Sequence, residues 1–334
     1  MENRRRYAFF AVWTLSTIGL VWLVLQGEHT FGTLALLPAL SALFACTITA
    51  LRWIGSPVPD DPVDAARTGR GPFALAIFAV AGALFALPIF LGRPLLFGLP
   101  VIGAVVMFFL RHQITRREVL YALALALVAG IAGLGAGWTT WIPLEAWAIV
   151  QVLLTLTGFL AGWGMLRHSG LLQAGVGRSR LLTEGTTSAL RGFIQGMMIG
   201  MPWALGSVVL GASNAERWVQ RWWQPAIAIQ PGIAEEAWGR LLLVPLVFLV
   251  LRRFAGNRVA FTAALLIVGY WFAYLHTRVL FDPLSTFMIG TLMVLPVSYV
   301  CLYRDVETAI GFHFSIDFVK FAAAYVLNAG LWFS

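Results

Sequence analysis

Apolar runs separated by short polar segments repeat along most of the chain. Each run is about 20 residues long, which is the length of α-helix that crosses the hydrocarbon core of a bilayer. The pattern predicts about eleven such spans, and therefore an all-α, polytopic transmembrane helical bundle. The predicted spans lie near residues 7–26, 31–51, 73–92, 94–110, 119–142, 144–166, 190–212, 233–251, 259–280, 284–303 and 307–330.

The arginines between the runs predict the orientation of the chain. If the N-terminal MENRRR is cytoplasmic and the spans alternate, only Arg93, Arg217, Arg221 and Arg278 fall in loops on the opposite side. Such an excess of basic residues in cytoplasmic loops is typical of polytopic membrane proteins. We therefore expect an integral protein of a prokaryotic plasma membrane, with its N-terminus in the cytoplasm.

The composition excludes an ordinary soluble domain. The chain is 60% hydrophobic and only 11% charged, with a mean hydropathy of +0.83, whereas soluble domains carry about 25% charged residues. The net charge of +8 comes from basic residues scattered at the ends of apolar runs, so it reflects topology and gives no reason to expect a nucleic-acid partner. The expected environment is the lipid bilayer. Cys46 and Cys301 both lie inside apolar runs and predict no disulfide framework.

Two segments differ from the repeating pattern. Residues 52–72 form a loop rich in Pro, Asp and Gly, the most linker-like stretch of the chain. Residues 213–231 carry Trp218, Trp222 and Trp223 close to two arginines. This mixture is typical of a helix that lies in the membrane interface, so we expect one there.

Ionisable residues inside the apolar runs gather in the last hundred positions. Each costs about 2.5–3.5 kcal/mol at a bilayer centre, so such residues are by default candidates for a functional site. The set consists of Glu235, Glu236, Arg240, His276, His313, Asp317 and Lys320.

The spacing of these residues predicts which of them act together. Glu236 and Arg240 are four apart, so they share one helix face and can form an ion pair within the membrane. Glu235 is rotated by about 100° from Glu236 and is free to point elsewhere. His313 and Asp317 are also four apart, so the carboxylate can orient the imidazole.

Three motifs on successive runs resemble those of a known family. They are EEAWGR (235–240), FAYLH (272–276) and HFSID (313–317). Their order resembles that of the CAAX protease and bacteriocin-processing family of intramembrane proteases, whose eukaryotic members are the type II CAAX prenyl endopeptidases. The resemblance covers about residues 190–330, and the first six runs carry no motif.

The resemblance implies hydrolysis of a peptide bond inside the membrane. Glu235 would act as general base on a water molecule that His276 helps to hold. His313 and Asp317 would stabilise the oxyanion of the tetrahedral intermediate. Much of the family has Asn where this chain has Asp317, and an ionised carboxylate cannot donate a hydrogen bond. Asp317 therefore either stays protonated or orients His313.

The resemblance also implies supporting roles and a division of the chain. Glu236 and Arg240 would form a structural ion pair, and Phe272 would be a packing residue. Residues 167–334 would be the protease domain, preceded by motif-free transmembrane helices in residues 1–166. The substrate would be a peptide or a membrane protein, and the oligomeric state stays open.

The participation of a metal ion is also open at this point. Two histidines and two carboxylates are donors that zinc accepts in a tetrahedral site. The HExxH signature is absent from the sequence, and the resemblance favours a glutamate-activated water without metal. We therefore expect no cofactor, with zinc as the alternative.

Straight helices predict the depths of the candidate residues. At 1.5 Å per residue, Glu235 and His276 lie about 25 and 27 Å from the cytoplasmic arginines at the ends of their helices. His313 lies only about 13 Å from Arg304 by the same rule. The rule therefore places Glu235 and His276 at the same depth. It places His313 about a dozen ångströms closer to the cytoplasmic side than these two residues.

Other interpretations of the same residues stay open. The two glutamates would occupy the first turn of a helix, where the macrodipole stabilises anions. His276 could be interfacial, and His313 with Asp317 could be an interhelical pair. Buried carboxylates and histidines also build proton relays, so a multi-span transporter or proton-coupled carrier is an alternative function. An inactive scaffold with a protease fold is another.

Overall fold

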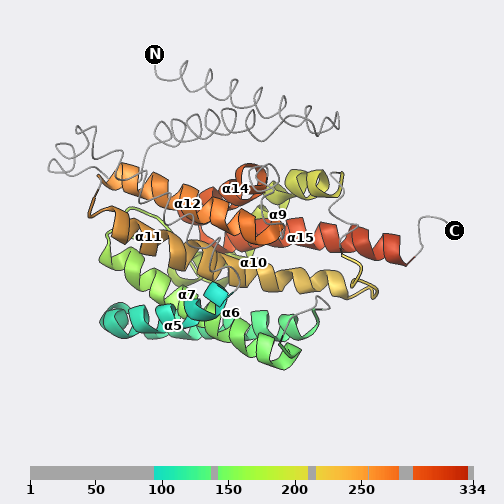
Figure 1. Ribbon diagram of the computed structural model, residues 1–334, viewed down its shortest axis with the longest axis horizontal. Coiled ribbons are helices and arrows are strands. Elements are labelled where there is room, and N and C mark those ends of the chain that lie inside the picture. The colour runs from blue at the N-terminus through green and yellow to red at the C-terminus, as the bar shows by residue number, and fades with distance from the viewer. Residues whose placement is uncertain (1–93, 137–141, 210–215, 255, 278–288, 330–334) are drawn as a thin grey trace, which may run out of the picture.

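The computed structural model describes residues 94–136, 142–209, 216–254, 256–277 and 289–329 (Figure 1). Every regular element in these ranges is a helix, which confirms the all-α prediction. The first three predicted spans and the loop 52–72 lie outside the described residues.

The long helices occur where the apolar runs predict them from 94–110 onward, whereas the short helices η1, α8 and η3 lie between the predicted spans. Predicted spans 233–251 and 284–303 each combine α-helix with a stretch of π-helix, η4 and η5. The elements are α5 (Pro94–Leu110), η1 (Arg111–Gln113), α6 (Arg116–Leu134), α7 (Leu144–His168), α8 (Arg180–Thr183), α9 (Thr186–Val209), η3 (Gln224–Ala228), α10 (Ile229–Glu235), η4 (Glu236–Leu242), α11 (Leu243–Leu251), α12 (Asn257–Thr277), η5 (Gly290–Val294), α14 (Leu295–Tyr303) and α15 (Val306–Asn328).

Three of the described helices are long and apolar enough to cross a membrane. They are α6, α7 and α15, with 19, 25 and 23 residues. Shorter apolar stretches occur at Gly98–Gln113 and Ala260–His276. These helices indicate a membrane protein, while the number of spans and the orientation of the chain stay predictions.

The predicted interfacial helix over residues 213–231 is wrong for residues 216–223, while residues 224–231 are helical. Residues 216–223 form turns, and helical structure begins only with η3. The Gln224 side-chain oxygen accepts the backbone N–H groups of Gln220 and Arg221 at 2.6 and 2.8 Å. A side chain that binds the backbone in this way competes with helix formation, so the tryptophans lie on a turn.

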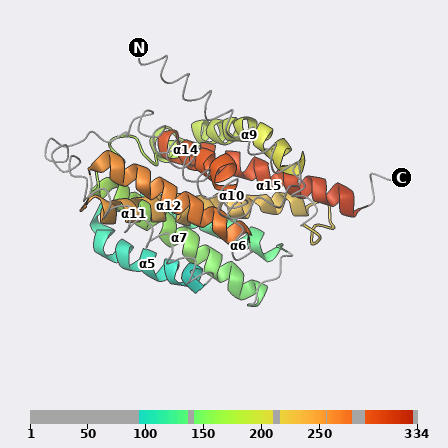
Figure 2. The ribbon, with the colours of Figure 1, turned by 45° about the horizontal axis from the view of Figure 1, so that its top comes forward.

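A pair of glycines on α7 brings this helix close to η4. A Cβ atom at Gly162 would lie 2.5 Å from the Leu241 carbonyl oxygen, and one at Gly158 would lie 2.9 Å from the Ala237 backbone. Small residues spaced by four allow helix backbones to approach closely inside a membrane. Helix α7 also packs against α5 and α6, which places it beside both (Figure 2).

Helices α9 and α15 form a second close contact. A Cβ atom at Gly196 would lie 2.0 Å from the Thr308 carbonyl oxygen, and one at Gly311 would lie 2.0 Å from the Phe193 carbonyl oxygen. The two helices run side by side in both views (Figures 1 and 2). Glycines thus fix the position of α15, the helix that carries His313.

One hydrophobic core joins the two parts into which the resemblance divides the chain. It contains Leu154 and Phe159 of α7 together with Trp238 of η4 and Phe261 of α12. The predicted boundary between residues 166 and 167 falls near the end of α7. The division into two domains stays a prediction.

Candidate functional site

The two adjacent glutamates lie at a junction between helix types. Helix α10 ends at Glu235 and the π-helical stretch η4 begins at Glu236. The expected position in the first turn of a helix is therefore wrong, because the chain is already helical from Ile229. A π-helical turn inserted into an α-helix is rare and occurs often at functional sites.

Glu236 and Arg240 form the predicted ion pair. Glu236 Oε1 lies 3.2 Å from Arg240 Nη1, and the two side chains are 0% and 2% exposed. Arg240 Nη1 also donates to the Glu235 carbonyl oxygen, and its Nε donates to Ser298 Oγ, both at 3.3 Å. The guanidinium lies 4.2 Å from the centre of the Phe272 ring. These contacts compensate a charge that would otherwise be buried alone.

His313 of α15 reaches both glutamates. Its Nδ1 lies 2.8 Å from Glu236 Oε1, and its Nε2 lies 3.5 Å from Glu235 Oε2. Asp317 Oδ2 is 3.4 Å from the same Nε2. The spacing of four residues between His313 and Asp317 therefore does bring them into contact.

His276 of α12 approaches Glu235 from another helix. Its Nδ1 lies 2.9 Å from the Phe272 carbonyl oxygen, and its ring stacks on the Phe272 ring with centroids 4.7 Å apart. A hydrogen bond donated by Nδ1 leaves Nε2 as the acceptor of a neutral imidazole. Nε2 lies 3.8 Å from Glu235 Oε2. Phe272 thus contacts both His276 and Arg240.

The expected gap in depth between His313 and Glu235 is wrong. The straight-helix rule takes the start of α15 as a point at the membrane surface. Asp305, Val306 and Thr308 are instead buried, so α15 begins inside the bundle. The four predicted catalytic residues therefore lie together: Glu235, His276, His313 and Asp317.

Lys320 continues this group of charges along α15. Its Nζ lies 2.8 Å from Glu216 Oε1 and 3.9 Å from Asp317 Oδ1. Glu216 belongs to the turn segment that precedes η3. Lys320 therefore ties this segment to α15 beside the site.

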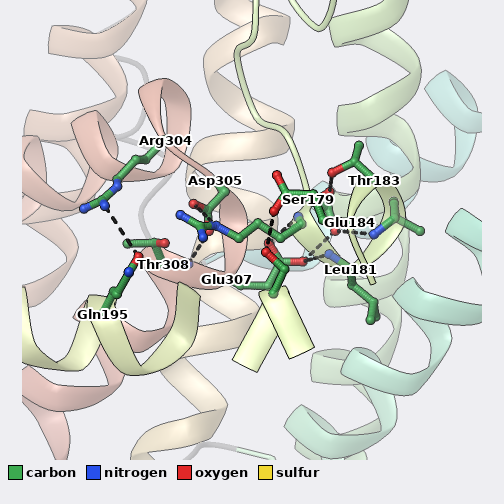
Figure 3. Close-up of polar contacts among 12 residues, drawn as sticks. Ser179, Leu181, Thr183, Glu184, Gln195, Arg304, Asp305, Glu307 and Thr308 are labelled. Atoms are coloured by element: carbon green, nitrogen blue, oxygen red, sulfur yellow. Dashed lines mark hydrogen bonds and ion pairs between the residues drawn. The ribbon is translucent and has the colours of Figure 1, made fainter. Parts of the chain in front are cut away.

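Glu307 is a buried carboxylate that the sequence reasoning missed. It accepts hydrogen bonds from Ser179 Oγ at 2.6 Å and the Leu181 N–H at 3.0 Å (Figure 3). Tyr121 Oη and the Arg180 N–H also donate to it, at 3.0 and 2.9 Å. Its position in the first turn of α15 made it look like a residue at the margin of an apolar run. The only sequence signal was an acidic residue at a helix N-terminus.

Asp305 secures the same end of α15. Its Oδ1 accepts the Thr308 N–H at 2.7 Å and caps the helix. Its Oδ2 lies 2.7 Å from Arg180 Nε. Figure 3 shows Asp305 and Glu307 beside the segment that leads into α8. These contacts hold α15 at the depth from which His313 reaches Glu235.

The donor types at the site are those that zinc accepts. Among the described residues, however, no group of three or more His, Cys, Asp or Glu side chains is arranged so that it could hold a metal ion. The expectation of a site without metal stays a prediction.

No protein-family model, no curated protein and no solved structure matches the chain. The resemblance of the three motifs to the CAAX protease and bacteriocin-processing family therefore stays a prediction.

Proposed function

We propose that this protein is an intramembrane endopeptidase of the type that the three motifs predict. One observation carries the proposal: Glu235 Oε2 faces the Nε2 atoms of His276 and His313, at 3.8 and 3.5 Å, from two other helices. These distances exceed those of most direct hydrogen bonds. Glu235 Oε2 is buried and has no hydrogen-bond partner among the described residues, so it is available to bind a water molecule between the two rings. A carboxylate and two imidazoles around a water form a general-base site.

The reaction begins when Glu235 takes a proton from the water as its oxygen attacks the carbonyl carbon of the peptide bond. His276 Nε2 accepts a hydrogen bond from the water and orients it. The tetrahedral oxyanion that forms is stabilised by His313 in its doubly protonated form, in which Nδ1–H is donated to Glu236 and Nε2–H is donated to the oxyanion. Glu235 then gives the proton to the leaving nitrogen, the C–N bond breaks, and a carboxylic acid and an amine result.

The neighbouring residues position this machinery. Glu236 binds His313 Nδ1 and so sets the direction of Nε2. Asp317 contacts the same ring and orients it. Residue 317 is therefore not required to donate a hydrogen bond to the oxyanion. The Arg240 ion pair keeps Glu236 in place.

The exposure of the residues agrees with entry of a peptide from the His276 side. The His276 side chain is 43% exposed, against 19% for Glu235 and 10% for His313. A peptide or a segment of a membrane protein that reached His276 would meet the general base next. The fully buried Glu236 lies behind them.

A proton-coupled carrier is the second candidate. A chain of charged groups joins Glu236 to His313, Asp317, Lys320 and Glu216, with links of 2.8, 3.4, 3.9 and 2.8 Å. Such chains also conduct protons in transporters. The endopeptidase is favoured because the Glu235 carboxylate faces both histidines and stands beside this series of charged groups, which it contacts through His313.

Comparison of protein N-termini in cells tests the proposal for every membrane-protein substrate at once. Membranes from cells that produce the wild type, Glu235→Gln, His276→Ala or Glu145→Gln at equal levels are labelled at free N-termini. Glu145 is exposed in the first turn of α7 and serves as the control.

A set of membrane-protein N-termini is expected in the wild type and the control but not in the two site variants. The same N-termini in all four samples would contradict the proposal. Proton uptake into liposomes that is lost in Glu235→Gln, with no change in N-termini, would favour the carrier instead.

A further inference from the structure

A second charged site lies away from the glutamates and histidines. A cavity of about 720 Å³ opens between the N-terminus of α6, the end of α7, the segment around α8 and the junction of α14 with α15. Neither Glu235 nor any of its three proposed catalytic partners lines it. The cavity is therefore distinct from the proposed peptidase site.

Arginines dominate the walls of this cavity. Five arginines and three carboxylates line it: Arg117, Arg167, Arg178, Arg180 and Arg304, with Glu118, Glu184 and Asp305. The cavity therefore carries an excess of positive charge.

Two of the arginines are already neutralised. Arg167 pairs with Glu118 at 2.5 Å, and Arg180 pairs with Asp305 at 2.7 Å. Arg117 and Arg178 have no acidic partner within the part of the chain that the structure describes. Both are exposed to solvent at the cavity, so their charges are available to an anion.

The backbone adds to this preference for negative charge. Thr115 caps α6, and Arg117 lies in the first turn of this 19-residue helix. The N-terminus of a helix carries partial positive charge and free N–H groups, which suit a phosphate. All five arginines also lie between the predicted spans, in segments that the distribution of basic residues predicts to be cytoplasmic.

We propose that this cavity binds a phosphate group, either the headgroup of an anionic phospholipid or a free phosphorylated anion. Guanidinium groups match phosphate oxygens with two parallel hydrogen bonds. Basic pockets between transmembrane helices at the cytoplasmic surface are suited to anionic headgroups. The proposal does not depend on peptidase activity.

Binding to the purified full-length protein in a neutral detergent tests the proposal. The probes are dioctanoyl phosphatidylglycerol, dioctanoyl phosphatidylcholine and inorganic phosphate. The test variant is Arg117→Gln with Arg178→Gln, since neither residue belongs to an ion pair of the described structure. The control is Arg116→Gln with Arg191→Gln, which removes the same charge from exposed positions outside the cavity.

Saturable binding of phosphatidylglycerol or phosphate is expected in the wild type and in the control. The test variant should bind about tenfold more weakly or worse, because it loses two charge-assisted contacts. Binding of phosphatidylglycerol but not phosphate identifies a lipid headgroup as the ligand. Phosphate that binds and displaces phosphatidylglycerol identifies a free anion.

Two results would overturn the proposal. One is wild-type protein that binds neither anion more tightly than phosphatidylcholine. The other is an equal loss in the test and control variants, which would mean attraction by net charge alone. Arg178→Gln alone, at an exposed loop position, gives the same comparison if the double variant does not fold. Glu235→Gln should bind as the wild type does, which separates this test from that of the peptidase.

Discussion

The Glu236 carboxylate contacts two buried basic groups, the Arg240 guanidinium and the His313 imidazole. Each would lack a carboxylate partner at this position without it. Its Oε1 contacts both Arg240 and His313, and the side chain is fully buried. The ion pair followed directly from the spacing of four residues. The contact with His313 did not, because sequence spacing within one helix says nothing about which residue of another helix lies opposite.

Replacement of Glu236 by Ala tests the structural part of this arrangement. Arg240 would stay buried without a carboxylate, so the free energy of unfolding should fall by about 3 kcal/mol. Thermal unfolding in detergent measures the effect, with Glu145→Ala at an exposed position as control. Equal melting temperatures for both variants would show that Arg240 does not depend on Glu236.

At the scale of the elements, the positions of the long helices were predictable from the sequence. The π-helical turns and the buried start of α15 were not. Apolar runs located the long described helices from α5 onward but not the short helices η1, α8 and η3, because burial in lipid demands a continuous apolar segment. The π-helical turns at Glu236–Leu242 and Gly290–Val294 have no signature in hydropathy. The buried start of α15 depends on contacts with Ser179 and Arg180, far away in the sequence.

The close contact of α9 with α15 gives a prediction at this scale. Gly196→Ala places a methyl group against the Thr308 carbonyl oxygen, so the helices must separate. The expected loss in the free energy of unfolding is about 1–3 kcal/mol. Gly206→Ala on the same helix meets no atom within 4 Å and serves as control. Chemical or thermal unfolding in detergent measures both, and equal stability would contradict the packing of α9 on α15.

At the scale of the molecule, the site is formed by three segments that meet only after folding. EEAWGR, FAYLH and HFSID lie on α10 with η4, on α12 and on α15. The residue types and their grouping were predictable, since charged residues are rare within apolar runs. That the three motifs come together in space was predictable only from the resemblance to the protease family. The straight-helix rule placed His313 at the wrong depth.

The most direct test of the account is hydrolysis by the purified protein in water labelled with ¹⁸O. The protein is reconstituted in liposomes with a mixture of transmembrane peptides, and the products are read by mass spectrometry. The wild type and Glu145→Gln should produce new C-termini that carry an ¹⁸O atom, whereas Glu235→Gln should produce none. Labelled products from Glu235→Gln at the wild-type rate, or no cleavage by the wild type, would contradict the account.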